Sequence, residues 1–384
     1  MESFAGRWPG TTRAASMRRN PAAPWRHVDL LLLGSIGLIA LIGSLMVFSS
    51  TRGGSGGADT AIIERHVMFV AVGASVMALT MMVDYRRFRD WAPIFYAGVC
   101  GLLIGVVSPL GTEVNGAQAW FDLGPMRLQP SEFSKIAVII GLASLCAHFG
   151  ADLDLRRLGV LLAVPAIPLV LIMLQPDPGT AMVFVAITMG VLVAAGVRAK
   201  HLAALTLVGL TAVVGLLSSG FLQDYQKDRL TVFLNPSAGL QGEAYNLNQS
   251  KIAIGSGGVL GKGLFEGTQT QLDIVPEQET DFIFTAVGEE LGFLGAATLL
   301  LLFALVVWRV WRIAQISRDH LGVLLCVGVL SLLVFQIFQN AGMTMGIMPI
   351  TGIPLPLVSY GGSSTIALFA GLGLVQSVHM RRFT

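Results

Sequence analysis

The sequence predicts an all-α integral membrane protein, and three observations support this fold class. Hydrophobic residues make up 54% of the 384 residues, charged residues only 12%, and the mean hydropathy is +0.71. Soluble domains carry about 25% charged residues, so this balance is typical of a membrane protein. Apolar runs of about 20 residues, the length of helix that crosses roughly 30 Å of hydrocarbon, recur from residue 28 onward. The runs are apolar on every side, whereas barrel strands alternate in polarity, so the spans are predicted to be helices.

About ten of these runs are predicted to be transmembrane helices. They occupy residues 28–47, 63–83, 91–110, 133–149, 158–174, 181–197, 201–221, 282–307, 321–345 and 359–378. The fourth to sixth runs are short for a membrane span.

The N-terminal tail, residues 1–25, is basic and rich in small residues, and we predict that it is disordered and cytoplasmic. The first apolar run lacks an Ala-x-Ala cleavage pattern, so it is predicted to be a retained signal anchor. Residues 26–384 are predicted to form one polytopic membrane domain.

The distribution of Lys and Arg predicts the orientation, because basic residues in short loops stay on the cytoplasmic side. With the N-terminus inside, most of the 25 basic residues fall in inner segments. An even number of spans then places both termini in the cytoplasm. The long polar segment before the eighth span, residues 222–282, becomes an extracellular loop, and residues 111–132 and 175–180 lie on the same side. The polar chemistry of the chain is therefore expected at the outer face.

Residue spacing argues against metal, disulfide and nucleotide chemistry. The three Cys residues lie within predicted spans, and the six His residues are scattered without metal-site spacing. Residues 255–263 are rich in glycine, but they lack the Gly and the Ser or Thr that a Walker A loop requires at fixed positions. We expect these glycines to allow tight turns and close backbone approach, and we expect no nucleic-acid partner.

Residues near the fourth span carry the first candidate site. Trp120 lies beside polar neighbours, which is typical of an interfacial segment. Ser131 and Glu132 form a helix-start signal, with Ser131 as the expected cap. Lys135 lies one turn after Glu132, so the two side chains can pair. Two interpretations stay open: a structural ion pair, or a cavity where Lys135 and Arg127 bind an anionic headgroup.

Other polar residues have structural interpretations. Asp177 is expected to form a tight turn. Glu289 and Glu290 lie about two turns into the eighth span, and adjacent helical positions differ by about 100°, so at most one can face a given cavity. Residues 348–364 are too rich in Pro and Gly for a regular helix and are expected to line a cavity. Three amides share a face of the ninth span and are expected to form hydrogen bonds in helix packing: Gln336, Gln339 and Asn340.

Several motifs together resemble the SEDS family of bacterial shape, elongation, division and sporulation proteins, which includes RodA, FtsW and SpoVE. The motifs lie at residues 248–258, 261–263, 267–269, 276–284, 288–292 and 348–364. The resemblance extends from the first span to the last. Residues 254–258 and 346–352 look most like the RodA branch, which acts in cell elongation.

This resemblance implies a peptidoglycan glycosyltransferase of the bacterial cytoplasmic membrane. Such a protein polymerises lipid II, the undecaprenyl-diphosphate-linked disaccharide-pentapeptide, into a growing glycan strand on the outer face. The implied partners are a class B penicillin-binding protein, which supplies the transpeptidase, and elongation-complex proteins. The acidic catalytic residue of the family falls on Asp281 in the Pro-Glu-x-x-Thr-Asp-Phe motif, and its important basic positions fall on Arg127 and Lys135. Further substrate-binding positions are expected at Glu132, Trp120, Asp177, Lys251, Lys262, Glu277, Thr280 and Ser359.

The chemistry of glycosyl transfer agrees with this placement. A sugar 4-hydroxyl must lose its proton as it attacks the anomeric carbon, so one carboxylate, Asp281, can act as general base. The departing diphosphate needs positive charge from Arg127 and Lys135 or from a divalent cation. Mg²⁺ or Mn²⁺ bridging the diphosphate is compatible with this chemistry, although the sequence names no ligand set.

Three residues depart from the usual family pattern. Ala119 stands where a polar residue commonly precedes the Trp, and Pro178 replaces a Leu. Glu279 replaces a common His and puts a second carboxylate two residues from Asp281, so the two groups disfavour each other's ionised form. Two other functions stay open: a lipid II flippase, and a scaffold that activates a penicillin-binding protein without chemistry of its own.

Overall fold

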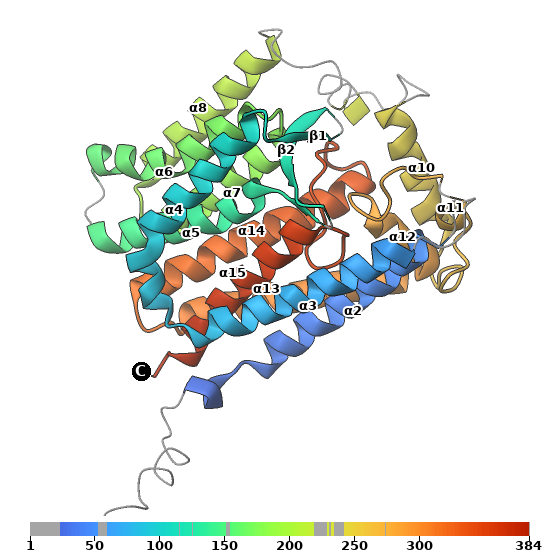
Figure 1. Ribbon diagram of the computed structural model, residues 1–384, viewed down its shortest axis with the longest axis horizontal. Coiled ribbons are helices and arrows are strands. Elements are labelled where there is room, and N and C mark those ends of the chain that lie inside the picture. Colours follow the sequence, from blue (N-terminus) through green and yellow to red (C-terminus); the bar gives the residue numbers. More distant parts are fainter. Residues whose placement is uncertain are drawn as a thin grey trace, which may run out of the picture.

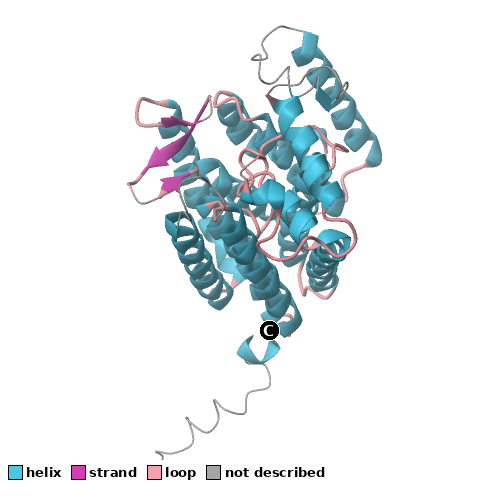
Figure 2. Ribbon diagram, turned by 90° about the vertical axis from the view of Figure 1, so that its right-hand side faces the viewer, coloured by secondary structure: helices cyan, strands magenta, loops and turns pink. Residues whose placement is uncertain are grey.

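The protein forms a bundle of long helices with a small sheet at one end (Figure 1 and Figure 2). The structure is a computed structural model that describes residues 24–52, 60–114, 116–124, 126–150, 154–218, 229, 232–233, 242–272 and 274–383. Residues 1–23 of the predicted tail lie outside the described residues, as does most of the first part of the predicted loop.

The long helices are α2 (Leu30–Ser50), α3 (Thr60–Met82), α4 (Tyr85–Val107), α5 (Pro130–Phe149), α6 (Leu155–Met173), α7 (Pro178–Ala194), α8 (Ala199–Ser218), α13 (Gly292–Gln315), α14 (His320–Thr344) and α15 (Gly362–Met380). The shorter elements are η1 (Pro24–His27), α10 (Glu243–Ser256), α11 (Thr268–Gln271), α12 (Ile283–Glu290), and the strands β1 (Thr112–Val114), β2 (Ala117–Asp122) and β3 (Arg127–Leu128).

The helices confirm the prediction of an all-α membrane protein. Within the described residues, 8 helices are long and apolar enough to cross a membrane, and α7 and the apolar part of α8 (Ala199–Ala212) are shorter. Each predicted run overlaps one of these helices. The count of about ten spans stays a prediction, as does their orientation.

The two ends of the described chain meet at the end of the bundle opposite the sheet (Figure 1). The rings of His27 and Phe383 lie 4.9 Å apart there, measured between centroids. Both ends of the described chain therefore lie at the same end of the helix bundle.

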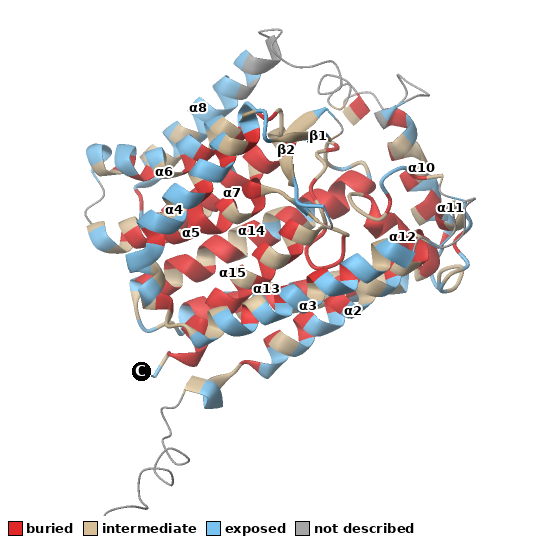
Figure 3. Ribbon diagram, in the orientation of Figure 1, coloured by how far each residue is buried: buried red, intermediate tan, exposed pale blue. Residues whose placement is uncertain are grey.

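Three helices form the centre of the bundle. Helix α15 packs against α3, α5 and α14, and most side chains of α5, α14 and α15 are buried (Figure 3). The surrounding helices expose large apolar side chains, as expected of surfaces that face lipid. The polar groups of the central helices therefore need partners within the protein.

Asp319 joins the first turns of α4 and α14 at the end opposite the sheet. Its carboxylate caps α14 by accepting from the N–H of Gly322 at 2.8 Å, and it also accepts from the Tyr85 hydroxyl at 2.8 Å and from Arg86 Nε at 3.2 Å. Burial alone raises the pKa of Asp319, but these hydrogen bonds outweigh burial and leave the pKa below its ordinary value. The interaction therefore stabilises the folded state above the ordinary pKa and is lost as the pH falls through the lowered pKa.

The segment before α5 is a three-stranded antiparallel sheet in the order β1-β2-β3, which the sequence analysis did not anticipate. Trp120 pairs with Thr112 in the β1–β2 ladder, and Arg127 pairs with Asp122 in the β2–β3 ladder. The Asp122 carboxylate accepts from the N–H of Gly124 at 2.9 Å, which closes the turn between β2 and β3. The sheet thus fixes Trp120 and Arg127 relative to each other.

The start of α5 differs from its prediction. The helix begins at Pro130 with Gln129 at the N-cap position, and no side chain caps it. Ser131 therefore lies inside the first turn, and its hydroxyl has no hydrogen-bond partner among the described residues. The prediction that Ser131 caps the helix is wrong, because Pro130 already occupies the first helical turn, where its missing N–H costs nothing.

The eighth predicted span is broken in two, so the prediction of one continuous run at 282–307 is wrong in this detail. Helix α12 ends at Glu290 and α13 begins at Gly292, which has a φ of +66°. The glycine-rich loop enters the break: the N–H groups of Lys262 and Gly263 donate to the carbonyls of Glu289 and Glu290 at 3.0 and 3.1 Å. On the other side, Phe293 and Leu294 donate their N–H groups to Gly258 and Val259 at 2.9 and 3.1 Å. The loop thus supplies partners for the free backbone groups at both helix ends.

Glycine is required where the loop backbone meets the broken helix. A Cβ atom at Gly257 would lie 2.0 Å from the carbonyl oxygen of Gly288. A Cβ atom at Gly261, which has a φ of +82°, would lie 2.1 Å from the carbonyl oxygen of Glu290. These contacts confirm the predicted close backbone approach.

Gly261→Ala is expected to destabilise the protein, because it forces the backbone away from α12 and adds a strain of roughly 1–2 kcal/mol for a left-handed non-glycine residue. Thermal unfolding of the purified protein in detergent measures the effect as a lower melting temperature.

Gly255→Ala is the matched control. Gly255 lies within α10, and a Cβ atom there would meet no atom within 4 Å. Alanine is favoured over glycine inside a helix by about 1 kcal/mol, so this variant should melt at or above the wild-type temperature. Equal melting temperatures for the two variants would contradict the proposed role of Gly261.

Candidate functional site

A polar cavity of about 690 Å³ lies at the sheet end of the bundle. Its walls come from α3, β2, β3, α5, α7, the turn before α12, and the non-helical segment before α15. Charged side chains of both signs line it: Arg65, Asp122, Arg127, Glu132, Lys135, Asp177, Glu277, Glu279 and Asp281. Segments far apart in the sequence therefore form one site.

Asp281 lies at the end of the turn that leads into α12. Its N–H donates to the carbonyl of Glu277 at 3.1 Å, and its own carbonyl accepts from Asn340 Nδ2 at 2.8 Å. The backbone of Gly352 comes close to its carboxylate: a Cβ atom at Gly352 would lie 3.2 Å from Oδ2 of Asp281 and 3.9 Å from Nη1 of Arg229. Hydrogen bonds thus hold the backbone of Asp281 in place, and the side chain of Arg229 lies near its carboxylate.

The opposite wall contains the predicted ion pair. Lys135 Nζ lies 2.7 Å from Glu132 Oε1, with side chains only 3% and 6% exposed. Arg127 projects from β3, and the hydroxyl of Ser363 in α15 donates to its carbonyl at 3.3 Å. The same hydroxyl accepts from the N–H of Gln129 at 2.9 Å, so α15 fixes this end of the sheet.

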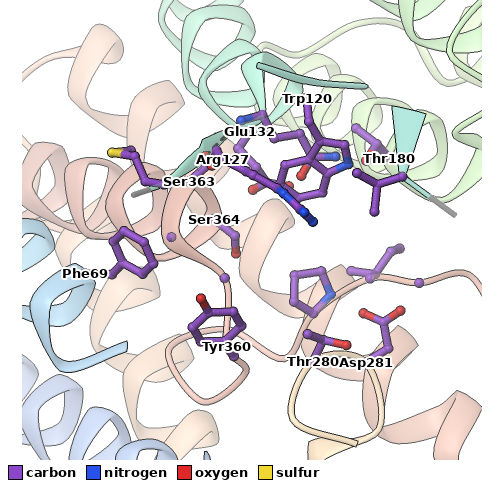
Figure 4. A pocket seen from close by; sticks show the side chains of 18 of the residues that line it. Phe69, Trp120, Arg127, Glu132, Thr180, Thr280, Asp281, Tyr360, Ser363 and Ser364 are labelled. Atoms are coloured by element: carbon purple, nitrogen blue, oxygen red, sulfur yellow. Dashed lines mark hydrogen bonds between the residues drawn. The ribbon is translucent and has the colours of Figure 1, made fainter. Parts of the chain in front are cut away.

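Figure 4 shows how the two walls face each other. Asp281 and Thr280 lie on one side of the cavity, and Arg127, Trp120 and Glu132 lie on the other. An acidic wall therefore faces a wall that carries Arg127 and Lys135.

Most of the predicted site residues line this cavity. They are Asp281, Arg127, Lys135, Glu132, Trp120, Asp177, Glu277 and Thr280. Asp177 also caps α7 by accepting from the N–H of Thr180 at 2.9 Å, which confirms its expected structural role. The non-helical segment that includes residues 352–354 and 360–361 lines the cavity as expected.

Three predicted binding residues do not line the cavity. Lys262 pairs with Glu289 at 2.7 Å, and the Ser359 hydroxyl accepts from the N–H of Leu355 at 2.7 Å. The ammonium group of Lys251 lies over Gly346, where an added Cβ would be 2.6 Å from Nζ. The structure therefore does not bring these side chains to Asp281.

Neither Glu289 nor Glu290 lines the cavity. Glu289 accepts hydrogen bonds from Lys262, from the N–H of Gln269 at 2.9 Å, and from both the N–H and the hydroxyl of Thr270 at 2.9 and 2.8 Å. Glu290 accepts from the Ser49 hydroxyl and from the N–H of Phe265 at 3.2 Å. Both glutamates therefore hold residues 262–270 against the end of α12.

The amides of α14 also differ from their prediction. Gln339 donates to the carbonyl of Pro349 at 2.8 Å, and Asn340 donates to the carbonyls of Asp281 and Ile353, each at 2.8 Å. These two side chains bond loop backbone rather than a neighbouring helix. The prediction of helix packing is wrong for them. Carbonyl groups of irregular backbone need hydrogen-bond donors from side chains, whereas carbonyl groups within a helix are already paired with N–H groups of the same helix.

Sequence reasoning missed a charged cavity residue, Arg65, which projects from α3. Tyr360, Ser363 and Ser364 line the cavity within the predicted segment 348–364. Arg65 was not among the predicted site residues. Its position near the outer end of an apolar run is a signal that such a residue can reach a cavity at membrane depth.

The described residues do not form a metal site. No group of three or more His, Cys, Asp or Glu side chains among them is arranged to hold a metal ion.

Comparisons with known proteins place the chain in a family. Residues 26–383 match the family model of FtsW, RodA and SpoVE, described as cell cycle proteins. The chain is 36% identical to peptidoglycan glycosyltransferase MrdB of Escherichia coli over 356 residues, 93% of this chain and 94% of the relative. It is also 36% identical to stage V sporulation protein E of Bacillus subtilis over 362 residues, 91% of this chain and 96% of the relative.

Solved structures agree with these matches. Rod shape determining protein RodA of Thermus thermophilus has a TM-score of 0.70 at 29% identity, over 93% of this chain and 98% of that chain. A chain from a peptidoglycan synthase complex that coordinates polymerization and crosslinking has a TM-score of 0.78 at 30% identity, over 93% of this chain and 99% of that chain. The chain therefore belongs to the FtsW/RodA/SpoVE family of cell cycle proteins.

Proposed function

We propose that the protein is a peptidoglycan glycosyltransferase that polymerises lipid II at the outer face of the bacterial cytoplasmic membrane. The observation that carries this proposal is the cavity in which Asp281 faces Arg127 and Glu132, with Lys135 paired to Glu132 in the same wall. The relatives from Escherichia coli and Treponema pallidum are named peptidoglycan glycosyltransferases, which supports the same reaction for this chain.

In the proposed reaction, Asp281 accepts the proton of the acceptor sugar 4-hydroxyl as that oxygen attacks the anomeric carbon of the donor. The new glycosidic bond forms as the bond from the anomeric carbon to the diphosphate oxygen breaks. The diphosphate departs with its negative charge near Arg127 and Lys135, whose cationic groups stabilise it.

Glu132 orients the buried ammonium of Lys135. The ammonium has three N–H donors, and Glu132 accepts one of them at 2.7 Å. Lys135 can therefore remain paired and still donate to a diphosphate oxygen in the cavity.

The membrane setting and the partners follow from the same proposal. The basic inner segments support a cytoplasmic position for both termini and an outward-facing cavity. The likeness to a chain of a synthase complex supports a class B penicillin-binding protein as partner, which would cross-link the strands made here, together with elongation-complex proteins.

Asp281→Asn is expected to abolish polymerisation, because the amide has the same shape but cannot accept the proton. We expect a rate at least about 100-fold lower, at the low end of what a general base contributes. Glycan synthesis from lipid II by the purified protein, alone and with its penicillin-binding protein, measures the rate.

Glu266→Gln is the control for Asp281→Asn. Glu266 lies in the same outer loop but does not line the cavity, so its variant should polymerise at the wild-type rate. Normal polymerisation by Asp281→Asn would refute the proposed base, and lipid translocation without polymerisation would favour a flippase.

The Glu132–Lys135 pair permits a test that separates structure from catalysis. Lys135→Met alone leaves a buried carboxylate without its partner, which typically costs about 3–5 kcal/mol of stability. The double variant Glu132→Leu/Lys135→Met replaces both charges with apolar groups and should recover most of that stability.

We expect the double variant to regain stability but to remain inactive, since the Lys135 ammonium that would stabilise the diphosphate is absent. Melting temperature and lipid II polymerisation are measured for both variants and for wild type. A double variant that is stable and polymerises normally would reduce the pair to a structural role.

A further inference from the structure

We propose that Gln278 is a positioning residue that fixes Asp281 through a network of hydrogen bonds in which the direction of each bond is determined. This inference rests on the proposed role of Asp281. Gln278 lies three residues before Asp281 in the same turn and is 1% exposed. It does not line the cavity, so its effect on the reaction must act through the turn.

The amide of Gln278 joins two threonines. Its Nε2 donates to the hydroxyl of Thr270 at 3.1 Å and to the hydroxyl of Thr285 at 2.9 Å. Thr270 belongs to α11 and Thr285 to the first turn of α12. One side chain therefore connects the loop, the turn that contains Asp281, and the helix that follows.

The chemistry of the two hydroxyls requires a donor at this position. Each hydroxyl carries one proton. Thr270 donates its proton to the Glu289 carboxylate at 2.8 Å, and Thr285 donates its proton to the carbonyl of Phe282 at 2.6 Å. Both oxygens can then only accept from residue 278, which must supply two N–H donors.

The acceptor half of the amide is not used in the same way. Gln278 Oε1 is buried and has no hydrogen-bond partner among the described residues. The position therefore requires the two N–H donors of the glutamine amide and makes no use of its carbonyl oxygen.

The network fixes the backbone on both sides of Asp281. Gln278 precedes it, Thr285 follows it, and both are tied to the buried Glu289 through Thr270. Asn340 holds the carbonyl of Asp281 from α14 at 2.8 Å. A displacement of about 1 Å at a reacting group can cost about 100-fold in rate, so small shifts of this turn should reduce turnover.

Gln278→Glu tests the proposal most sharply, because it keeps the size of the side chain and removes both donors. Steady-state polymerisation of lipid II by the full-length protein is measured across a range of lipid II concentrations. We expect kcat to fall by about tenfold or more while KM stays within about twofold, since Gln278 does not touch the substrate cavity.

The pH profile gives a second readout that a merely structural role would not move. Protonation of the carboxylate that Gln278→Glu introduces restores one O–H donor, so the kcat of this variant relative to wild type should rise as the pH falls. The ratio is compared at pH values where the wild-type kcat no longer changes with pH, so that protonation of Asp281 contributes little to it. A ratio independent of pH would overturn the donor requirement.

Gln118→Glu is the matched control. Gln118 also uses Nε2 for two hydrogen bonds, to the carbonyls of Ser108 at 2.8 Å and Gly111 at 3.3 Å, and it does not line the cavity. Its variant should lose stability to a similar degree but keep kcat within about twofold of wild type. Equal losses of kcat in the two variants would overturn the positioning role.

Melting temperatures establish that each variant is folded at the assay temperature. If Gln278→Glu does not fold, Gln278→Ala removes both donors without adding charge and is measured in the same way, with a retained kcat contradicting the proposal. A wild-type protein that makes no glycan, or an Asp281→Asn variant that does, would refute the proposed function itself. Failure of the positioning role alone would instead leave wild type active, Asp281→Asn inactive and the Gln278 variants with a normal kcat.

Discussion

The arrangement of the sheet end depends on one buried carboxylate, that of Glu289. Its side chain is fully buried at the end of α12, so the protein itself must supply its donors. The loop supplies them from Lys262, Gln269 and Thr270. Satisfying this charge pulls the loop against the break between α12 and α13, where only glycine backbone fits, and Thr270 then carries the constraint to the turn of Asp281.

The two walls of the cavity come from distant parts of the chain, and the segment before α15 links them. On the acidic side, the N–H of Tyr360 donates to the carbonyl of Glu279 at 2.8 Å. On the basic side, Ser363 bonds the backbone of Arg127 and Gln129. Pro and Gly residues interrupt the helix here, which frees backbone groups and brings Gly352 close to the carboxylate of Asp281. A regular helix in this segment would offer no such contacts, because its N–H groups would be used internally.

Much of the fold could be predicted from the sequence, because apolar runs of membrane length need no knowledge of long-range partners. The ion pair of Glu132 and Lys135 was equally accessible, since helical spacing determines it. The break at Gly292 was not, because its cause is a loop that returns from earlier in the chain and bonds the exposed helix ends. Long-range pairing also explains why Lys262 does not line the cavity as expected. Its partner Glu289 lies 27 positions away in the sequence, and no local pattern predicts that contact. The placement of both walls around one cavity likewise required the structure.

The central claim is that one cavity holds the donor diphosphate beside Arg127 and Lys135 and the acceptor hydroxyl beside Asp281. The most direct measurement is a structure of the full-length protein with a non-hydrolysable lipid-linked disaccharide diphosphate and a short glycan acceptor. We expect the diphosphate against the two basic side chains and the acceptor oxygen within about 2.6–3.2 Å of the Asp281 carboxylate. A diphosphate bound outside this cavity, such as beside Lys251 or Lys262, with Asp281 beyond reach of the acceptor, would contradict it.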